Sequence, residues 1–167
     1  MGSANSENNY NSDESIGSCE GNSSHTDPTI YFRNLDLQYF GLLQYFQHCK
    51  SIEGLNHLRQ SANGNFDNGT YIYGILMLCR GDFSEGKKYL DKLSWKTNQV
   101  RTVQCLTMIK NSLKEIRVIL KTKYLTNTST MEPLPDCHNH DMDSACEDCY
   151  YFKRMNEFVD YISTKKQ

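Results

Sequence analysis

The densest group of metal-binding side chains in the sequence lies at residues 137–149, in the stretch CHNHDMDSACEDC. Cys146 and Cys149 have the C-x2-C spacing with which a short loop presents two thiolates to one metal ion. Cys137 and His140 form a second pair with the same gap, so the full pattern is C-x2-H-x5-C-x2-C. Four such ligands complete a tetrahedron, and Zn²⁺ is the intracellular metal that this donor set favours. We therefore predict a structural zinc site.

Alternatives to this ligand set remain open at the level of sequence. His138 is a competing imidazole ligand, although its place directly after Cys137 makes it harder to bring to the same ion. A loop of reduced cysteines without a metal is the simpler alternative. A catalytic zinc site is not supported, because zinc deaminases carry H-x-E followed by P-C-x-x-C, whereas here Ala145 precedes Cys146. We therefore expect no enzymatic activity.

The length and charge of the chain limit the classes of protein that it can be. Its 167 residues suffice for one domain with a hydrophobic core, and a net charge of −2 gives no basic character that would require nucleic acid. No stretch is apolar enough for a signal peptide or a membrane span. We expect a cytoplasmic or nuclear protein, in which cysteines serve as thiols or metal ligands rather than disulfides.

Helical periodicity covers most of the sequence after residue 30, and no stretch shows the alternation of a strand. The predicted helices span residues 35–49, 52–62, 70–79, 83–93, 100–124 and 150–162. The apolar face of the last helix is expected to consist of Phe152, Met155, Phe158, Val159 and Ile162.

Three segments follow from this pattern. Residues 1–29 are acidic and polar with little apolar content, which predicts a disordered tail. Residues 30–125 form a predicted helical domain. Residues 126–167 form the Cys/His loop and a C-terminal helix, which we expect to pack on the same domain.

The first four predicted helices form two copies of one unit. FGLLQYF aligns with YGILMLC, and SIEGLNHL aligns with FSEGKKYL. Gly41 then matches Gly74 with a shift of 33 residues, and Gly54 matches Gly86 with a shift of 32. Such helix pairs bury their apolar faces only by stacking. The predicted fold is all-α: a short helical-repeat (Sel1/TPR-like) solenoid, closed by the long helix at 100–124, with a metal-stapled C-terminal loop and helix.

Two sequence resemblances support this architecture. The segment LRQSANGNFDNGTYIYGILMLCRGDFSEGKKYL resembles a Sel1-type, tetratricopeptide-like repeat. Residues 37–162 are similar to the C-terminal region of a family of plant F-box proteins, in which CRG, C-H and DMD-x-x-C-x-x-C-[YF]-Y recur in the same order. The resemblance implies a module of the ubiquitin pathway that recruits a partner or substrate. The F-box that binds Skp1 in that family is not found in the first thirty residues, so direct Skp1 binding is not expected.

Several side chains are candidates for contact with a protein partner, the aromatic ones on condition that they are not part of the core. On the predicted helix 100–124, one face carries Lys110, Lys114, Arg117 and Lys121. Aromatic candidates on the repeats are Tyr39, Tyr45 and Tyr71. The basic face suggests an alternative function, a zinc-containing protein that binds nucleic acid. Nucleic acid remains the less favoured partner, because a basic helix face is more often simply solvated.

The sequence begins MGSANS, which matches the N-myristoylation pattern M-G-x-x-x-[ST] with Gly2 as the acceptor. The neighbouring segment is acidic and has no second anchor, so any membrane binding through Gly2 is expected to be marginal.

Overall fold

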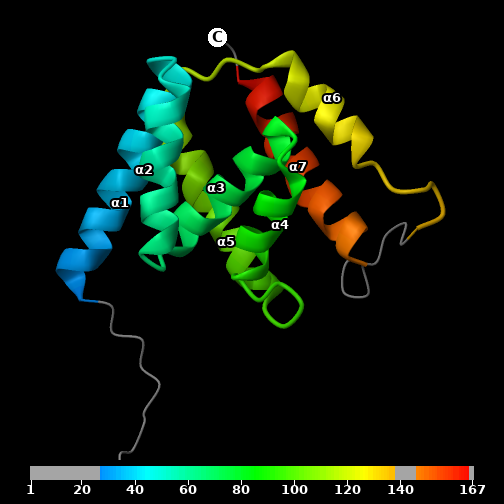
Figure 1. Ribbon diagram of the computed structural model, residues 1–167, viewed down its shortest axis with the longest axis horizontal. Coiled ribbons are helices and arrows are strands. Elements are labelled where there is room, and N and C mark those ends of the chain that lie inside the picture. Colours follow the sequence, from blue (N-terminus) through cyan, green and yellow to red (C-terminus); the bar gives the residue numbers. More distant parts are fainter. Residues whose placement is uncertain (1–26, 138–145, 166–167) are drawn as a thin grey trace, which may run out of the picture.

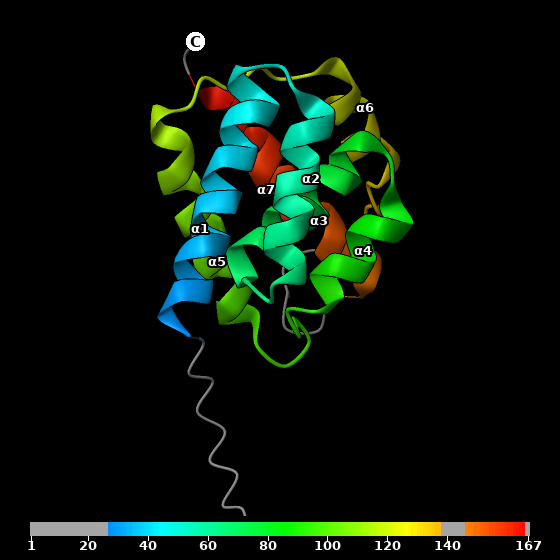
Figure 2. The same ribbon diagram turned by 60° about the vertical axis from the view of Figure 1, so that its left-hand side comes forward.

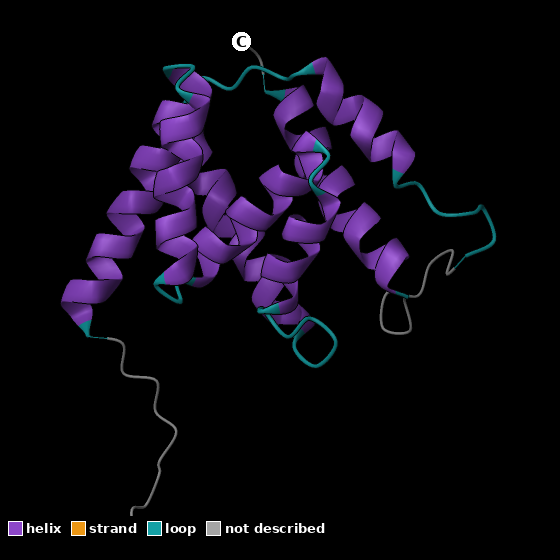
Figure 3. Cartoon of the chain, in the orientation of Figure 1, coloured by secondary structure: helices purple, strands orange, loops and turns teal. Residues whose placement is uncertain are grey.

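The computed structural model describes residues 27–137 and 146–165 (Figure 1). Its elements in chain order are α1 (Pro28–Leu42), η1 (Leu43–Gln47), α2 (Ser51–Asn63), α3 (Asp67–Arg80), α4 (Phe83–Asp91), α5 (Gln99–Ser112), η2 (Leu113–Glu115), α6 (Thr122–Thr130) and α7 (Glu147–Thr164). Figure 3 shows helices joined by loops and no strand over the described residues, which confirms the all-α class. None of the helices in these two ranges is long and apolar enough to cross a membrane.

The first helix begins earlier than the apolar pattern predicts, at Pro28 rather than residue 35. Asp27 is its N-cap, and the Asp27 carboxylate accepts the backbone N–H of Thr29 at 2.9 Å. Proline is favoured at the first helical position because its missing N–H would have no partner there. Pro28 and Thr29 therefore belong to the folded region and not to the predicted tail.

The two repeat units have the same internal geometry, which confirms the alignment found in the sequence. Where α1 crosses α2, a Cβ atom added at Gly41 would lie 2.8 Å from Leu58 Cγ and 2.9 Å from the Gly54 carbonyl oxygen. Where α3 crosses α4, a Cβ atom at Gly74 would lie 3.0 Å from Leu90 Cγ and 3.1 Å from the Gly86 carbonyl oxygen. In both units, paired glycines let two helix backbones approach closely, and a leucine of the second helix covers the contact.

Helix α3 is the centre of the fold. Every residue from Gly69 to Cys79 is buried. Helices α2, α4, α5, α6 and α7 all contact α3, as the two ribbon views show from different sides (Figures 1 and 2). A helix that is apolar around its whole circumference must be surrounded by other elements, and this requirement fixes the position of α3.

The single long helix predicted over residues 100–124 is wrong. The chain leaves the helix at Ile116, whose φ of −102° and ψ of 128° are extended, and re-enters one at Thr122. Ile116 and Val118 are buried while Arg117 and Ile119 are exposed, so burial alternates between successive residues. β-Branched residues favour this conformation.

Hydrogen bonds from distant segments satisfy the backbone at the break. The Lys165 ammonium donates to the carbonyl oxygens of Leu113 and Ile116, the latter at 2.8 Å. The backbone N–H of Arg117 donates to Gln47 Oε1 at 3.3 Å. Backbone groups that lose their helical partners at the break are thereby hydrogen-bonded to other segments. The interruption of the helix therefore leaves these groups paired.

Two buried tyrosines join the first repeat to α6, and they support a test of this packing. Tyr45 and Tyr124 are almost fully buried, and their hydroxyls form a hydrogen bond with each other. We expect Tyr124→Phe to lower the free energy of unfolding by about 1–3 kcal/mol, because it leaves the Tyr45 hydroxyl buried without its partner. Tyr45→Phe should act similarly. The double variant should be more stable than the sum of the two losses predicts, as urea denaturation of the four proteins would measure. Strictly additive losses would show that the hydroxyl pair is not coupled.

Candidate functional site

The described residues bring three cysteines together at the start of α7. Cys137 lies in the segment after α6, Cys146 is the N-cap of α7, and Cys149 is buried in its first turn. One sulfur atom from each lies within 4.8 Å of the others. The Cys137 sulfur is 3.7 Å from that of Cys146 and 3.4 Å from that of Cys149. Three thiols at these distances can bind a metal ion.

The sulfur separations fit shared coordination better than a disulfide. A disulfide bond is about 2.05 Å long, so neither measured separation is compatible with one. Two thiolates that each lie about 2.3 Å from a tetrahedral zinc ion are about 3.8 Å apart. The Cys137–Cys146 separation of 3.7 Å is close to this value. The Cys137–Cys149 separation of 3.4 Å is shorter than this value. The three cysteines therefore lie close enough together to share one metal ion.

The start of α7 also affects the protonation of the thiols. The backbone N–H of Cys149 donates to the Cys146 sulfur and lowers the pKa of the Cys146 thiol, so its thiolate is favoured. Burial raises the pKa of Cys149 to about 12, in the absence of any ion. A metal cation reverses this second effect, because coordination deprotonates a thiol. Metal binding here must therefore release protons.

The two histidines of the predicted ligand set, His140 and the alternative His138, lie outside the described residues, as does Gly2. The structure thus brings Cys137, Cys146 and Cys149 together and provides no test of the fourth ligand.

Aromatic packing and ion pairs connect the cysteine cluster to the repeats. The Tyr150 ring stacks on Trp95 with centroids 3.9 Å apart, and the Tyr150 hydroxyl donates to Thr102 Oγ1 at 3.0 Å. The carboxylates on the first turn of α7 also reach the repeat region: Glu147 accepts from Lys96 Nζ at 2.7 Å, and Asp148 pairs with Lys87 at 3.7 Å. The start of α7 is therefore bound to α4 and to the loop that follows it.

The buried face of α7 largely agrees with the predicted one. Met155, Phe158, Val159 and Ile162 are buried as expected, whereas Phe152 is only partly buried. Tyr151, which the helical pattern does not single out, is fully buried, and its hydroxyl donates to the Asp91 carboxylate. The first turns of α7 thus also bury Cys149 and Tyr151, and Tyr151 contacts the end of α4 through Asp91.

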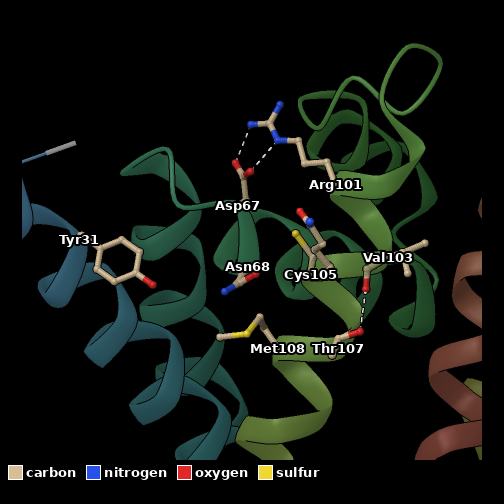
Figure 4. Close-up of a pocket in the computed structure, with 9 residues that line it drawn as sticks. Tyr31, Asp67, Asn68, Arg101, Val103, Cys105, Thr107 and Met108 are labelled. Carbon is tan, nitrogen blue, oxygen red and sulfur yellow. Dashed lines mark hydrogen bonds and ion pairs between the residues drawn. The ribbon is translucent and has the colours of Figure 1, made fainter. Parts of the chain in front are cut away.

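A second candidate site is a groove of about 460 Å³ between α1, α3 and α5. Its residues are Tyr31, Asp67, Asn68, Arg101, Val103, Gln104, Cys105, Thr107 and Met108. Arg101 binds both carboxylate oxygens of Asp67 at one end of the labelled residues, with Nε at 2.5 Å and Nη2 at 2.6 Å (Figure 4). Met108 extends from α5 toward α1, on which Tyr31 lies (Figure 4).

The composition of this groove is typical of a protein-binding surface. Tyrosine, methionine and arginine are enriched in protein interfaces. Val103 and Met108 are exposed large apolar residues on the outer side of α5, and Tyr31 is exposed on α1. The groove combines residues that are far apart in the sequence, so no local sequence pattern indicates it. Asp67 and Arg101 carry no local signal of their pairing.

The residues predicted as interaction sites are not on one surface. Tyr39 is 42% exposed, whereas Tyr45 and Tyr71 are 1% and 0% exposed and belong to the core. Tyr45 and Tyr71 fill the space where the repeats meet α6 and α7. These two tyrosines are therefore not available to a partner.

The predicted basic face does not exist, because its helix is interrupted. The four residues lie in α5, in η2, in the extended segment and at the N-cap of α6, in the order Lys110, Lys114, Arg117 and Lys121. Lys110 Nζ lies 5.2 Å from the centre of the Tyr161 ring, and Lys121 Nζ lies 4.8 Å from that of Tyr45. Lys110 and Lys121 thus each contact a tyrosine ring of the same chain. The four cations do not form one continuous basic helix face that nucleic acid could contact.

The fold and the paired-glycine units define a helical-repeat protein of the tetratricopeptide class. Residues 22–114, more than half of the chain, match the family described as "Plant tetratrico peptide repeats". The chain belongs to this family.

A curated relative confirms the link to plant F-box proteins. The chain is 40% identical over 65 residues to F-box protein At2g35280 of Arabidopsis thaliana. The match covers 37% of this chain and 39% of the relative, so it spans well under two thirds of that protein. No solved structure gives a significant match.

Proposed function

We propose that this protein is a non-enzymatic recruiting module, which binds a protein partner in the groove between α1, α3 and α5. The observation that carries this proposal is the groove itself, where exposed Met108, Val103 and Tyr31 line the same hollow as the Arg101–Asp67 pair. Membership of a helical-repeat family supports it, since stacked helices form extended binding surfaces.

The similarity to a protein named as an F-box protein suggests the pathway. We propose that the partner is a component or a substrate of ubiquitin ligation, encountered in the cytoplasm or nucleus. Reduced thiols persist in these compartments, which agrees with the use of Cys137, Cys146 and Cys149 as thiols.

We also propose that Zn²⁺ joins these three cysteines to His140, with His138 as the alternative fourth ligand. Support comes from the sulfur separations and from the C-x2-C spacing. The ion would supply no chemistry of its own, because four protein ligands leave no open position. Its role would be to hold residues 131–137, which are poor in apolar side chains, against the start of α7.

The groove can be tested with single charged substitutions. Met108→Asp should abolish capture of the partners that proximity labelling finds for the wild-type chain in plant cells, because an unpaired carboxylate in an apolar contact is costly to bury. Leu134→Asp is the matched control: Leu134 is 82% exposed and lies in a different hollow, beside Cys137. The control should retain the partners. Loss with Leu134→Asp and retention with Met108→Asp would assign binding to the cysteine cluster instead.

A further inference from the structure

The outward face of α1 is a hollowed surface distinct from the groove, and within the described residues its one ring contact with another helix is that of Phe40 with His57 of α2. Six residues form it, at the positions of one helix stripe: Thr29, Phe32, Arg33, Asp36, Leu37 and Phe40. Phe32 is 61% exposed and Phe40 is 47% exposed. In Figures 1 and 2, α1 lies at the edge of the helix assembly, with α2 beside it. Two such phenylalanines on one exposed stripe indicate a surface that another element covers.

The repeat relationship shows what kind of element fits this face. The shift of 33 residues places Asp36, Leu37 and Phe40 over Gly69, Thr70 and Tyr73 of α3. In α3 this stripe faces the preceding helix: Thr70 Oγ1 donates to the Ala62 carbonyl at 3.4 Å, and a Cβ atom at Gly69 would lie 2.3 Å from Ser61 Oγ. The equivalent face of α1 has no helix before it in the described residues. Its shape is therefore suited to a helix.

The charges on the face select among possible helices. Asp36 occupies the position where α3 has Gly69, so a further repeat packed in the same close manner would bury a carboxylate. Burying an unpaired charge is strongly unfavourable, so the covering helix must bring a cation to Asp36 and an anion to Arg33. Neither residue forms an ion pair within the part of the chain that the structure describes.

A second copy of α1 meets this requirement. The intervals between the six residues of the stripe are the same in both chain directions. An antiparallel copy related by a two-fold axis therefore places Arg33 of each copy against Asp36 of the other. The same arrangement places Phe32 against the second copy's Leu37, and Thr29 against the second copy's Phe40. The geometry points to self-association of this protein through the outward face of α1. One short helix pair buries little surface, so the dimer should be weak and transient.

Analytical ultracentrifugation of the full chain over a range of concentrations tests this proposal through two charge variants. The wild-type mass should rise from 19.3 kDa toward twice that value as concentration increases. Arg33→Asp makes the face wholly acidic and Asp36→Arg makes it wholly basic, so each variant alone should stay monomeric. An equimolar mixture should form a heterodimer, because each acidic position then meets a basic one.

Circular dichroism of both variants provides the folding control, and exposed helix positions such as these should tolerate the change. Restored association in the mixture is a result that misfolded variants could not produce. A wild-type chain that stays monomeric would overturn the proposal and leave the face to a helix of another protein. Association that persists equally in both single variants would place the contact elsewhere.

Discussion

Replacing Cys149 with serine is expected to remove the metal and to loosen the start of α7. The wild-type protein, purified under reducing conditions, should contain about one zinc ion per chain, because three cysteines and one histidine complete a tetrahedron. Cys149→Ser removes one of the four proposed ligands and leaves three. Elemental analysis should therefore find little zinc in the variant.

The loosening should be local, and hydrogen exchange can locate it. Exchange should accelerate over residues 131–137 and the first turn of α7, the two segments that the proposed ion would join. The later part of α7 should change little, because Met155, Phe158 and Ile162 are buried in the common core. Helices α2 to α4 should stay protected.

Cys49→Ser is the matched control, since Cys49 is exposed and belongs to the loop between η1 and α2. It should leave the zinc content unchanged. His140→Ala should lower zinc content much more than His138→Ala. A wild-type protein with far less than one zinc per chain, or unchanged metal in Cys149→Ser, would mean that the cluster is a loop of reduced cysteines.

Adding a single methyl group at the paired glycines should destabilise both repeats to a similar degree. At Gly54 a Cβ atom would lie 2.7 Å from the Tyr45 backbone nitrogen, and at Gly86 it would lie 2.8 Å from the Gly74 carbonyl oxygen. Backbone atoms cannot move away without separating the two helices. We expect Gly54→Ala and Gly86→Ala each to lower the free energy of unfolding by about 2 kcal/mol.

The expected loss of stability is opposite in sign to the effect of helix propensity, since alanine normally stabilises a helix relative to glycine by about 1 kcal/mol. A loss would therefore report the close helix crossing. Ser84→Ala in α4 is the control: Ser84 is exposed and lies within one turn of Gly86, so its replacement should have little effect on stability. Urea denaturation would measure all three variants. Stabilisation by either glycine replacement would contradict the close helix crossing.

The sequence carried enough information to predict the repeat architecture and part of the cysteine cluster. The spacing of Gly41, Gly54, Gly74 and Gly86 is local and periodic, and close helix packing requires small residues at those positions. The C-x2-C pair likewise lies within one helical turn, so its two sulfurs are neighbours whatever the rest of the fold does. Properties of this kind depend on residues close together in the chain.

The tertiary structure alone decided features that depend on distant neighbours. The spacing of Leu113 and Ile116 fits a helix, yet the backbone is extended at Ile116. The extended backbone lets both Ile116 and Val118 enter the core, and Lys165 donates a hydrogen bond to the Ile116 carbonyl that the helix no longer pairs. Tyr45 and Tyr71 look like interface aromatics in sequence but are buried by elements far along the chain. Periodicity shows which side of an element is apolar; burial is determined by the element that is placed against it.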